Sequence, residues 1–337
     1  MMRLTMLLGV GLLCPACPAN AQPEAAPPLL TLHGAIQTPE YASFLPDDSV
    51  AALRAPGEGR LATGLRLQGE AAEDPAPRPA TDPQDADAIA RELSNPTNAR
   101  MSLGANFLYQ TFDGDLPDAE DQDTFTLLFQ PSLPFPQENG YNLIFRPALP
   151  LFFDQPVFNG STGEFEDDGL QIGDLSYDLA YGTTTESGIL YLGGIVGAFP
   201  TATNSKLGRD QLTLGPEIAL GLVKPWGVIG TLITHQWDIA GEDDFDTNIT
   251  GGQYFYAFGL GGGYQFAAGP TFSFNHEAKG DDKWTFPLGV GVSKTKVIGS
   301  TPVKLALQTW YYAARPDSFG PEWEIRFTLT PVVTAPW

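Results

Sequence analysis

Charged, polar and aromatic side chains recur at every second position within the apolar segments of residues 100–337. In a β-strand such positions share one face, because successive side chains point to opposite sides. A surface of this composition can bind or filter small solutes through charge, hydrogen bonds and ring stacking. The candidates for such a selective lining are Arg146, Asp174, Asp178, Glu217, Lys304, Gln308, Trp310, Tyr312, Glu324 and Arg326, and Asn106, Gln110, Gln130 and Asn142 accompany them.

The three histidines offer little catalytic chemistry. His33 has no acid or nucleophile patterned around it, and His276 shares the parity of the apolar residues before it, which predicts an interfacial position. His235 is close to Asp238, but three residues along a strand place two side chains on opposite faces. Because Gly-x-Ser-x-Gly and HExxH motifs are also absent, we expect no enzyme; the alternative is a hydrolase that uses His235.

Acidic side chains gather in turn-rich segments, where their oxygens could bind Ca²⁺ or Mg²⁺ and bridge to envelope phosphates. The sequence has no EF-hand spacing, so a solvated surface is the favoured interpretation and cation binding the alternative. We therefore expect no resident metal. The acidic clusters are Asp113, Asp115, Asp118, Glu120, Asp121 and Asp123; Glu164, Glu166, Asp167 and Asp168; and Glu242, Asp243, Asp244 and Asp246.

Glycines at positions 259, 261, 262 and 263 resemble a nucleotide-binding loop only in composition. They lie within a strand-like run and open no helix, which a dinucleotide-binding motif requires. We interpret them as positions of strand curvature and close packing. The sequence accordingly predicts no cofactor.

The segments that must position the lining residues alternate apolar and polar side chains with period two. Twelve such runs begin near Met101, Thr124, Tyr141, Gln171, Ile189, Gln211, Val228, Gln253, Thr271, Trp284, Val303 and Trp323. Many exceed about ten residues, as a tilted membrane-spanning strand requires, whereas strands of soluble sandwiches average about five or six. The predicted fold is all-β: a closed antiparallel transmembrane β-barrel of about 12 strands over residues 100–337.

The connections between these runs alternate in length. Long acidic connections such as DGDLPDAEDQD follow the odd-numbered runs, and short ones (QENG, TTTESG, KPWG, AAGP, IGSTP) follow the even-numbered runs. Outer-membrane barrels have long extracellular loops and tight periplasmic turns. The pattern therefore predicts that both ends of the barrel sequence lie on the periplasmic side.

The last run has the features of an assembly signal for outer-membrane barrels. Its apolar residues Phe327, Leu329, Val333 and the final aromatic Trp337 lie on one face. Pro331 departs from the pattern, because it removes a ladder donor. We expect the barrel-assembly machinery and outer-membrane lipid to be partners of the chain.

The N-terminal hundred residues differ in composition from the rest. Residues 1–21 combine Arg3, an apolar run and the small-x-small site Ala19-Asn20-Ala21, as a secretory signal peptide does. Residues 22–99 are rich in Pro and Ala and are interpreted as an extended periplasmic segment with a short helix near 85–94. A tether is the favoured role of this segment, and a plug in the barrel is the alternative.

Composition excludes several classes of function. Cys14 and Cys17 both lie in the signal peptide, so the exported chain has no disulfide, thiol or cysteine-zinc chemistry. The formal charge of −22 disfavours nucleic acid as a partner, because clustered Lys and Arg supply that affinity.

Several segments resemble a known family of outer-membrane barrels, the MetA-type or phenol-degradation-pathway family, whose members are often called transporter-like. The similar segments are FDGDLP with QDTFTLLFQP, IGDLSYDLAYGTTTESG, FPTATNSKLGRDQLTLGPE, THQWDIAG, FPLGVGVSKT and YYAARPDSFGPEWEIRFTLTPVV. The resemblance implies an outer-membrane barrel that passes small hydrophobic or aromatic compounds. It supplies no catalytic residues.

The sequence thus predicts a bacterial outer-membrane channel for passive uptake or efflux of small, hydrophobic or aromatic molecules. The alternative is a closed structural barrel, with salt bridges filling its interior, whose acidic loops bind divalent cations, envelope components or surface partners. The solute, the pore radius and the oligomeric state are left open by the sequence.

Overall fold

The computed structural model describes residues 83–167, 169–241 and 246–336, and the structural statements below concern these residues. The signal peptide, His33, Asp168, Glu242, Asp243, Asp244 and Trp337 of the sequence predictions lie outside them. Among the described residues, one helix precedes the sheet. The elements of the barrel are α2 (Pro83–Glu92), β1 (Met101–Asp113), β2 (Asp123–Pro136), β3 (Asn142–Asp154), β7 (Leu175–Thr184), β8 (Ile189–Phe199), β9 (Gln211–Lys224), β10 (Gly227–Gly241), β11 (Asn248–Gly261), β12 (Tyr264–Ala268), β13 (Thr271–Asn275), β14 (Trp284–Ile298), β15 (Thr301–Ala314) and β16 (Gly320–Val333).

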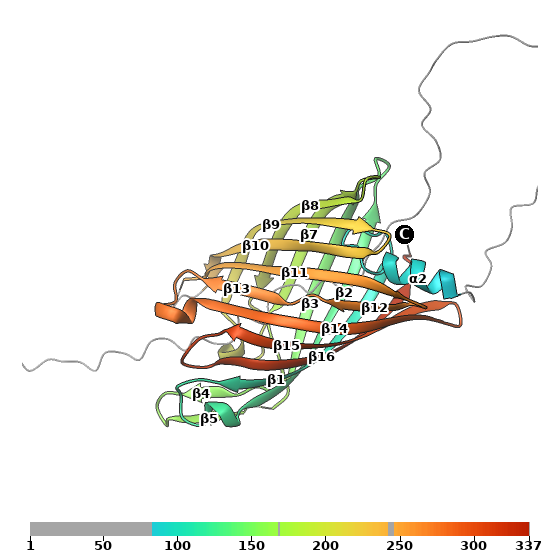
Figure 1. Ribbon diagram of the computed structural model, residues 1–337. Helices are drawn as coiled ribbons and strands as arrows, with labels where there is room; N and C mark the ends of the chain where they lie inside the picture. Colours follow the sequence, from blue (N-terminus) through green and yellow to red (C-terminus); the bar gives the residue numbers. More distant parts are fainter. Residues whose placement is uncertain (1–82, 168, 242–245, 337) are drawn as a thin grey trace, which may run out of the picture.

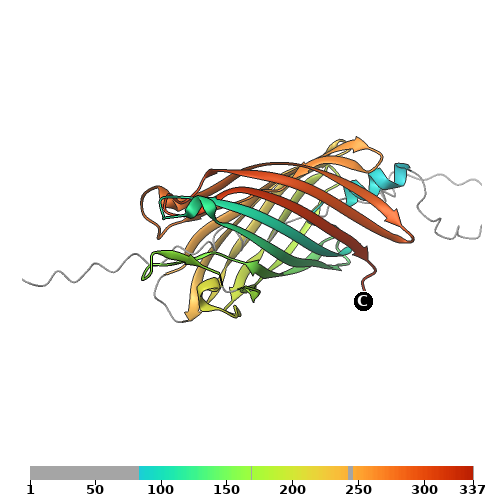
Figure 2. The ribbon, with the colours of Figure 1, turned by 90° about the horizontal axis from the view of Figure 1, so that it is seen from below.

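These strands form a closed antiparallel barrel of twelve strands, in which β12 and β13 are two halves of one strand. Each strand pairs with its neighbour in the chain, and the pairing of β1 with β16 closes the cylinder. Figures 1 and 2 show the strands tilted along the cylinder, with α2 at the end where β16 finishes. The structure confirms the predicted fold class.

The two ends of the cylinder differ. We call the end with α2 and the short turns the helix end, and the opposite end the loop end (Figure 1). The loop end carries the hairpin of β4 (Val157–Asn159) and β5 (Glu164–Glu166), the short strand β6 (Gln171–Ile172) and the 3₁₀ helices η1 (Ala119–Asp121), η2 (Ser205–Leu207) and η3 (Gly280–Lys283).

The inner and outer faces invert the pattern of a soluble protein. On β16 the outward Trp323, Ile325 and Phe327 are 46%, 51% and 41% exposed, whereas the inward Glu324 and Arg326 are 1% and 3% exposed. An exposed apolar belt is stable where hydrocarbon covers it, and the closed ladder satisfies the backbone groups that lipid cannot. No helix of the described residues is long and apolar enough to cross a bilayer.

One turn lies elsewhere than predicted. The hairpin between β11 and β12 turns at Gly261, Gly262 and Gly263, whose φ values are 87°, 61° and 80°. Three consecutive left-handed residues are accessible to glycine at little cost, so this glycine run makes the turn instead of a curved strand. The predicted turn AAGP falls within the next barrel strand, where Gly269 and Pro270 separate β12 from β13.

The N-terminal segment contacts the barrel directly. Its helix spans Pro83–Glu92, close to the predicted 85–94, and the following residues Leu93–Asn98 are buried. Within this stretch Ser94 bonds to Gln265 on β12, and Asn95 bonds to Thr184 on β7. Residues 93–98 are thus attached to barrel strands at the helix end. Residues 22–82 lie outside the described residues, and for them the tether and the plug both stay predictions.

Loops pack over the other end. The ring of Phe165 on the β4–β5 hairpin lies 4.8 Å from that of Phe319, which stacks at 4.7 Å on the inward Phe112. Lys206 of η2 forms an ion pair of 2.9 Å with Glu166 of the hairpin. Apolar packing and this ion pair hold the hairpin and the η2 loop together over the loop end.

Candidate solute pathway inside the barrel

Nine of the ten predicted lining residues lie at inward positions of barrel strands, and the tenth, Asp174, directly precedes β7 at the loop end; each is at most 7% exposed. Exposure this low means that side chains fill the bore rather than line a wide aqueous channel. A barrel of intermediate strand number permits this filling, because its diameter lies between that of filled eight-stranded and open sixteen-stranded barrels. These ten residues form two polar clusters and one site at each end of the barrel, and other inward residues form apolar groups beside them.

The first polar cluster joins three strands through Arg146. Its Nε lies 2.9 Å from Oδ1 of Asp178, its direct cross-strand partner, and its Nη2 lies 4.0 Å from Oε1 of Glu217. On β8, Gly194 is the direct cross-strand partner of Glu217, and a Cβ atom there would lie 2.4 Å from the Leu179 carbonyl oxygen. Two carboxylates against one guanidinium give this cluster a formal charge of −1.

The second polar cluster surrounds Glu324. One carboxylate oxygen accepts hydrogen bonds from Gln110 Nε2 at 2.7 Å and from the Tyr312 hydroxyl at 3.0 Å. The other oxygen pairs with Arg326 at 2.6 Å. The guanidinium of Arg326 lies 3.9 Å over the ring of Trp310. Register explains the grouping, because Gln110, Glu324 and Trp310 occupy directly paired positions of β1, β16 and β15.

An apolar patch covers the inner face of β7 to β11. It consists of buried aliphatic side chains with one aromatic ring, and it carries no charge. A second small group of Leu108, Leu128 and Ala148 lines β1 to β3. The interior can therefore contact an apolar molecule. The residues of the patch are Ala180, Leu190, Leu192, Ala219, Val223, Val228, Leu232 and Phe255.

The barrel wall is interrupted between β12–β13 and β14. The ladder register stops where Phe266 faces Val292 and resumes where Ser273 faces Thr285. Between them the chain bends inward at Gly269 and Pro270, both of which are buried. Proline cannot donate to a ladder and is typical of such irregular positions.

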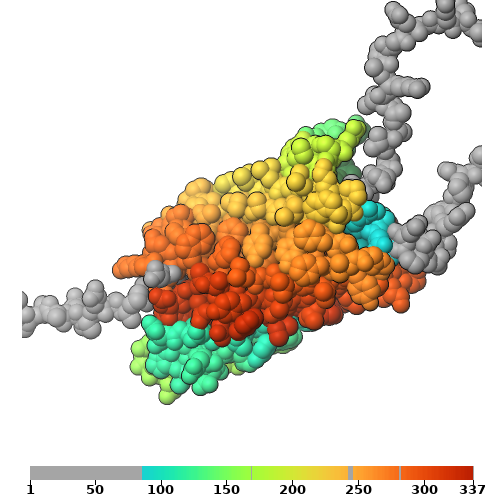
Figure 3. Space-filling view, viewed as in Figure 1, coloured from blue at the N-terminus to red at the C-terminus, as the bar shows by residue number. Residues whose placement is uncertain are grey.

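Two outward tyrosines of β11 span this interruption. The Tyr254 hydroxyl bonds to the Pro287 carbonyl, and the Tyr256 hydroxyl bonds to the Gly289 carbonyl, each at 2.9 Å. Side-chain hydroxyls thus replace backbone donors that the ladder lacks here. Because side chains fill the interruption, the wall has a continuous surface in the space-filling view (Figure 3).

On the inside, Pro270 and Trp310 lie against the same interruption. A Cβ added at Gly289 would be 2.3 Å from the Pro270 ring and 2.6 Å from Trp310. Gln308 joins the bend to the second polar cluster, because its Oε1 accepts from Gly269 N and from Trp310 Nε1 at 3.1 Å each. Sequence analysis missed Tyr254 and Tyr256; the Gly-Pro pair between two apolar runs was the available signal.

Asp174 and Lys304 occupy opposite ends of the barrel. The oxygens of Asp174 accept three backbone hydrogen bonds of 2.9–3.0 Å from Thr201, Ala202 and Arg209, so this acid holds the η2 loop. Burial lowers the pKa of the neighbouring Arg209 to about 10, and the Asp174 carboxylate opposes this shift. Lys304 lies at the helix end, where its Nζ is 3.2 Å from the Ser94 hydroxyl. Their roles in selectivity stay predictions.

The two histidines among the described residues lie outside the bore. His235 and His276 each contact the Thr250 hydroxyl at 2.8 Å on the outer surface. The ring of His235 lies 4.2 Å from that of Trp237. Asp238 instead accepts a hydrogen bond from the Thr247 backbone nitrogen. The described residues therefore show no acid that orients His235.

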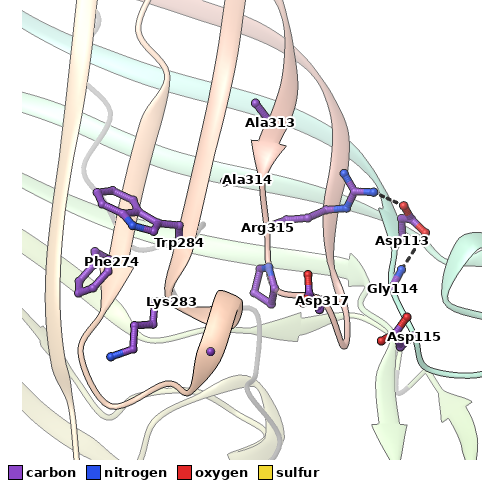
Figure 4. A pocket seen from close by; sticks show the side chains of 12 residues that line it. Asp113, Gly114, Asp115, Phe274, Lys283, Trp284, Ala313, Ala314, Arg315 and Asp317 are labelled. Atoms are coloured by element: carbon purple, nitrogen blue, oxygen red, sulfur yellow. Dashed lines mark hydrogen bonds and ion pairs between the residues drawn. The ribbon is translucent and has the colours of Figure 1, made fainter.

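A cavity of about 900 Å³ lies at the rim of the loop end, between η3 and the ends of β1 and β15. Figure 4 shows Arg315 directed at Asp113 on one side and Phe274 with Trp284 on the other. Trp284 is outward and exposed, so this cavity belongs to the outer rim rather than to the bore. No group of three His, Cys, Asp or Glu among the described residues could hold a metal ion.

No family model and no curated protein match the chain. Among solved structures, the COG4313 outer membrane channel from Pseudomonas putida F1 is similar, with 12% identity, a TM-score of 0.52, and coverage of 70% of this chain and 96% of that one. The NanC porin has 10% identity and a TM-score of 0.44, and the match covers 69% of this chain and 100% of that one. A mutant TodX monoaromatic hydrocarbon channel has 9% identity and a TM-score of 0.39, and the match covers 69% of this chain and 89% of that one. The first likeness supports the fold of an outer-membrane barrel.

Proposed function

We propose that this chain is a bacterial outer-membrane channel for small hydrophobic or aromatic molecules. The observation that carries the proposal is the interrupted wall, at which an apolar exterior meets Trp310 and the inner face. The barrel fold, the apolar belt and the resemblance to MetA-type barrels support a location in the outer membrane. Outer-membrane lipid and the barrel-assembly machinery are its proposed partners.

A filled bore favours apolar solutes over hydrophilic ones. Both ends are covered, by residues 93–98 at the helix end and by packed loops at the loop end. A sugar would need a continuous aqueous path, whereas an aromatic molecule can leave the lipid, pass Tyr254 and Tyr256, and contact Trp310. Displacing these rings breaks the three hydrogen bonds that their hydroxyls make with the Pro287 carbonyl and with the carbonyl and nitrogen of Gly289, at about 1 kcal/mol each.

A disulfide across the interruption tests this route. The rings of Phe272 on β13 and Phe286 on β14 lie 5.7 Å apart at its edge. In the F272C/F286C variant, oxidation should lower the uptake of radiolabelled toluene by intact Gram-negative cells, and reduction should restore it. The matched control is L288C/Y311C, which joins directly paired residues of β14 and β15 where the ladder is intact.

Equal toluene uptake by the oxidised and reduced test variant would contradict passage through this wall. The filled interior also favours a second candidate, a closed structural barrel whose acidic loops bind surface partners. That candidate predicts that deleting the whole chain leaves toluene uptake unchanged, so the same assay separates the two functions.

A further inference from the structure

Lys304 is a buried cation without an acidic partner. Its side chain is 5% exposed on the inner face of β15, and no carboxylate of the described residues lies within ion-pair distance. Its ammonium has one hydrogen-bond partner in the part of the chain that the structure describes, the Ser94 hydroxyl at 3.2 Å. An ammonium carries three donors, and burial without a counter-ion is costly.

The residues around Lys304 are also poor in partners. Thr295 and Thr330 are its direct cross-strand neighbours on β14 and β16, and the hydroxyl of each is buried and unpaired. Directly opposed residues have Cβ atoms about 5 Å apart, so the three side chains share one patch of the inner face. Gln265 joins them through Ser94, which its Oε1 contacts at 2.9 Å, and its amide nitrogen is unpaired.

We propose that Lys304, Thr295 and Thr330 bind the carboxylate of a small solute, which replaces the Ser94 hydroxyl at the ammonium. A carboxylate accepts up to four hydrogen bonds and matches an ammonium flanked by two hydroxyl donors. This inference rests on the proposed function and names hydrophobic or aromatic acids as one class of its solutes. Because Ser94 belongs to the buried stretch 93–98, binding of the acid also loosens that stretch.

The experiment measures benzoate binding to the full chain in detergent micelles by titration calorimetry. Benzoate should bind the wild type, and Lys304→Met should weaken it by about tenfold or more, because a charge-assisted contact is lost. Benzamide, which has the same shape without the charge, should bind neither protein. The matched control is Lys296→Met. It removes an exposed, outward lysine of β14 that is paired with Val303, the residue before Lys304, and it should leave benzoate binding unchanged.

Ser94→Ala provides an independent check. If the carboxylate replaces the Ser94 hydroxyl, removing this competitor should tighten benzoate binding. Benzoate should also speed hydrogen exchange at residues 93–98 in the wild type and leave it unchanged in Lys304→Met. Different migration of boiled and unboiled samples on gels would show that each variant is folded.

Three results would overturn the inference. They are the absence of benzoate binding, equal binding by the wild type and Lys304→Met, and equally tight binding of inorganic phosphate, which would indicate a generic oxyanion site. The channel itself is tested separately. Toluene uptake that responds to the wall disulfide without benzoate binding would leave the channel intact and reject the site; the reverse would reject the channel alone.

Discussion

At the scale of single residues, the buried charges of the inner face depend on one another. Arg146 faces two carboxylates, and Asp178 and Glu217 are both about 1% exposed or less. Removing Arg146 alone leaves its partners charged in a poorly hydrated interior, whereas removing all three residues together avoids that cost. The barrel should therefore lose more stability when Arg146 alone is replaced than when all three residues are replaced.

Arg146→Met should lower the free energy of unfolding by about 3 kcal/mol, because two buried carboxylates lose their cation. Urea unfolding in phospholipid vesicles, followed by tryptophan fluorescence, measures the change. The triple replacement of Arg146, Asp178 and Glu217 by Met, Leu and Met should recover most of the loss. A single variant as stable as the wild type would show that water already screens this cluster.

Trp310 contacts both the interruption of the wall, at Gly289, and the second polar cluster, through Arg326. Trp310→Ala should increase toluene uptake, because the ring that lies against Pro270 and Gly289 is removed. Trp310→Phe keeps an apolar ring and should change uptake much less. Lower uptake in the alanine variant, with the barrel still folded, would instead assign the indole a binding role that the route requires.

At the scale of elements, a glycine turn holds the N-terminal helix. The carboxylate of Asp87 on α2 accepts hydrogen bonds from the backbone nitrogens of Gly262, at 3.0 Å, and Gly263. Consecutive backbone N–H groups of a left-handed turn form a concave anion site. The same glycines that make the turn thus also dock the helix over the end of the barrel.

Asp87→Ala should release α2 from the turn and raise the ionic conductance of the protein in planar bilayers, because residues 93–98 lose their anchor. Asp115→Ala, at the loop end, is the control for removing one acid and should leave conductance near the wild-type value. Unchanged conductance in Asp87→Ala would mean that the hydrogen bonds of Ser94 and Asn95 hold the stretch alone.

At the scale of the whole molecule, the closed ladder and the apolar belt predict how the protein behaves in solution. The folded chain should require detergent and should migrate differently on gels before and after boiling, because a closed barrel resists dodecyl sulfate until heat breaks its ladder. Identical migration, or a monodisperse chain in plain buffer, would contradict the membrane assignment.

The sequence by itself determined the barrel. Alternation with period two fixes which side chains share a face, and for the segment Trp323 to Arg326 this alone separates lipid-facing from inward residues. The sequence also predicted the fold class, the number of strands and a helix near residues 85–94, where α2 lies. These features depend on local patterns and on the need to satisfy backbone hydrogen bonds in lipid.

The tertiary structure alone decided where these faces meet. The pairing of Arg146 with Asp178, the stacking of Arg326 on Trp310 and the contact of Lys304 with Ser94 join residues that are distant in sequence. Their proximity depends on the register between strands and on the path of residues 93–98. A one-residue change of register exchanges the faces of a strand, so no local pattern specifies such contacts.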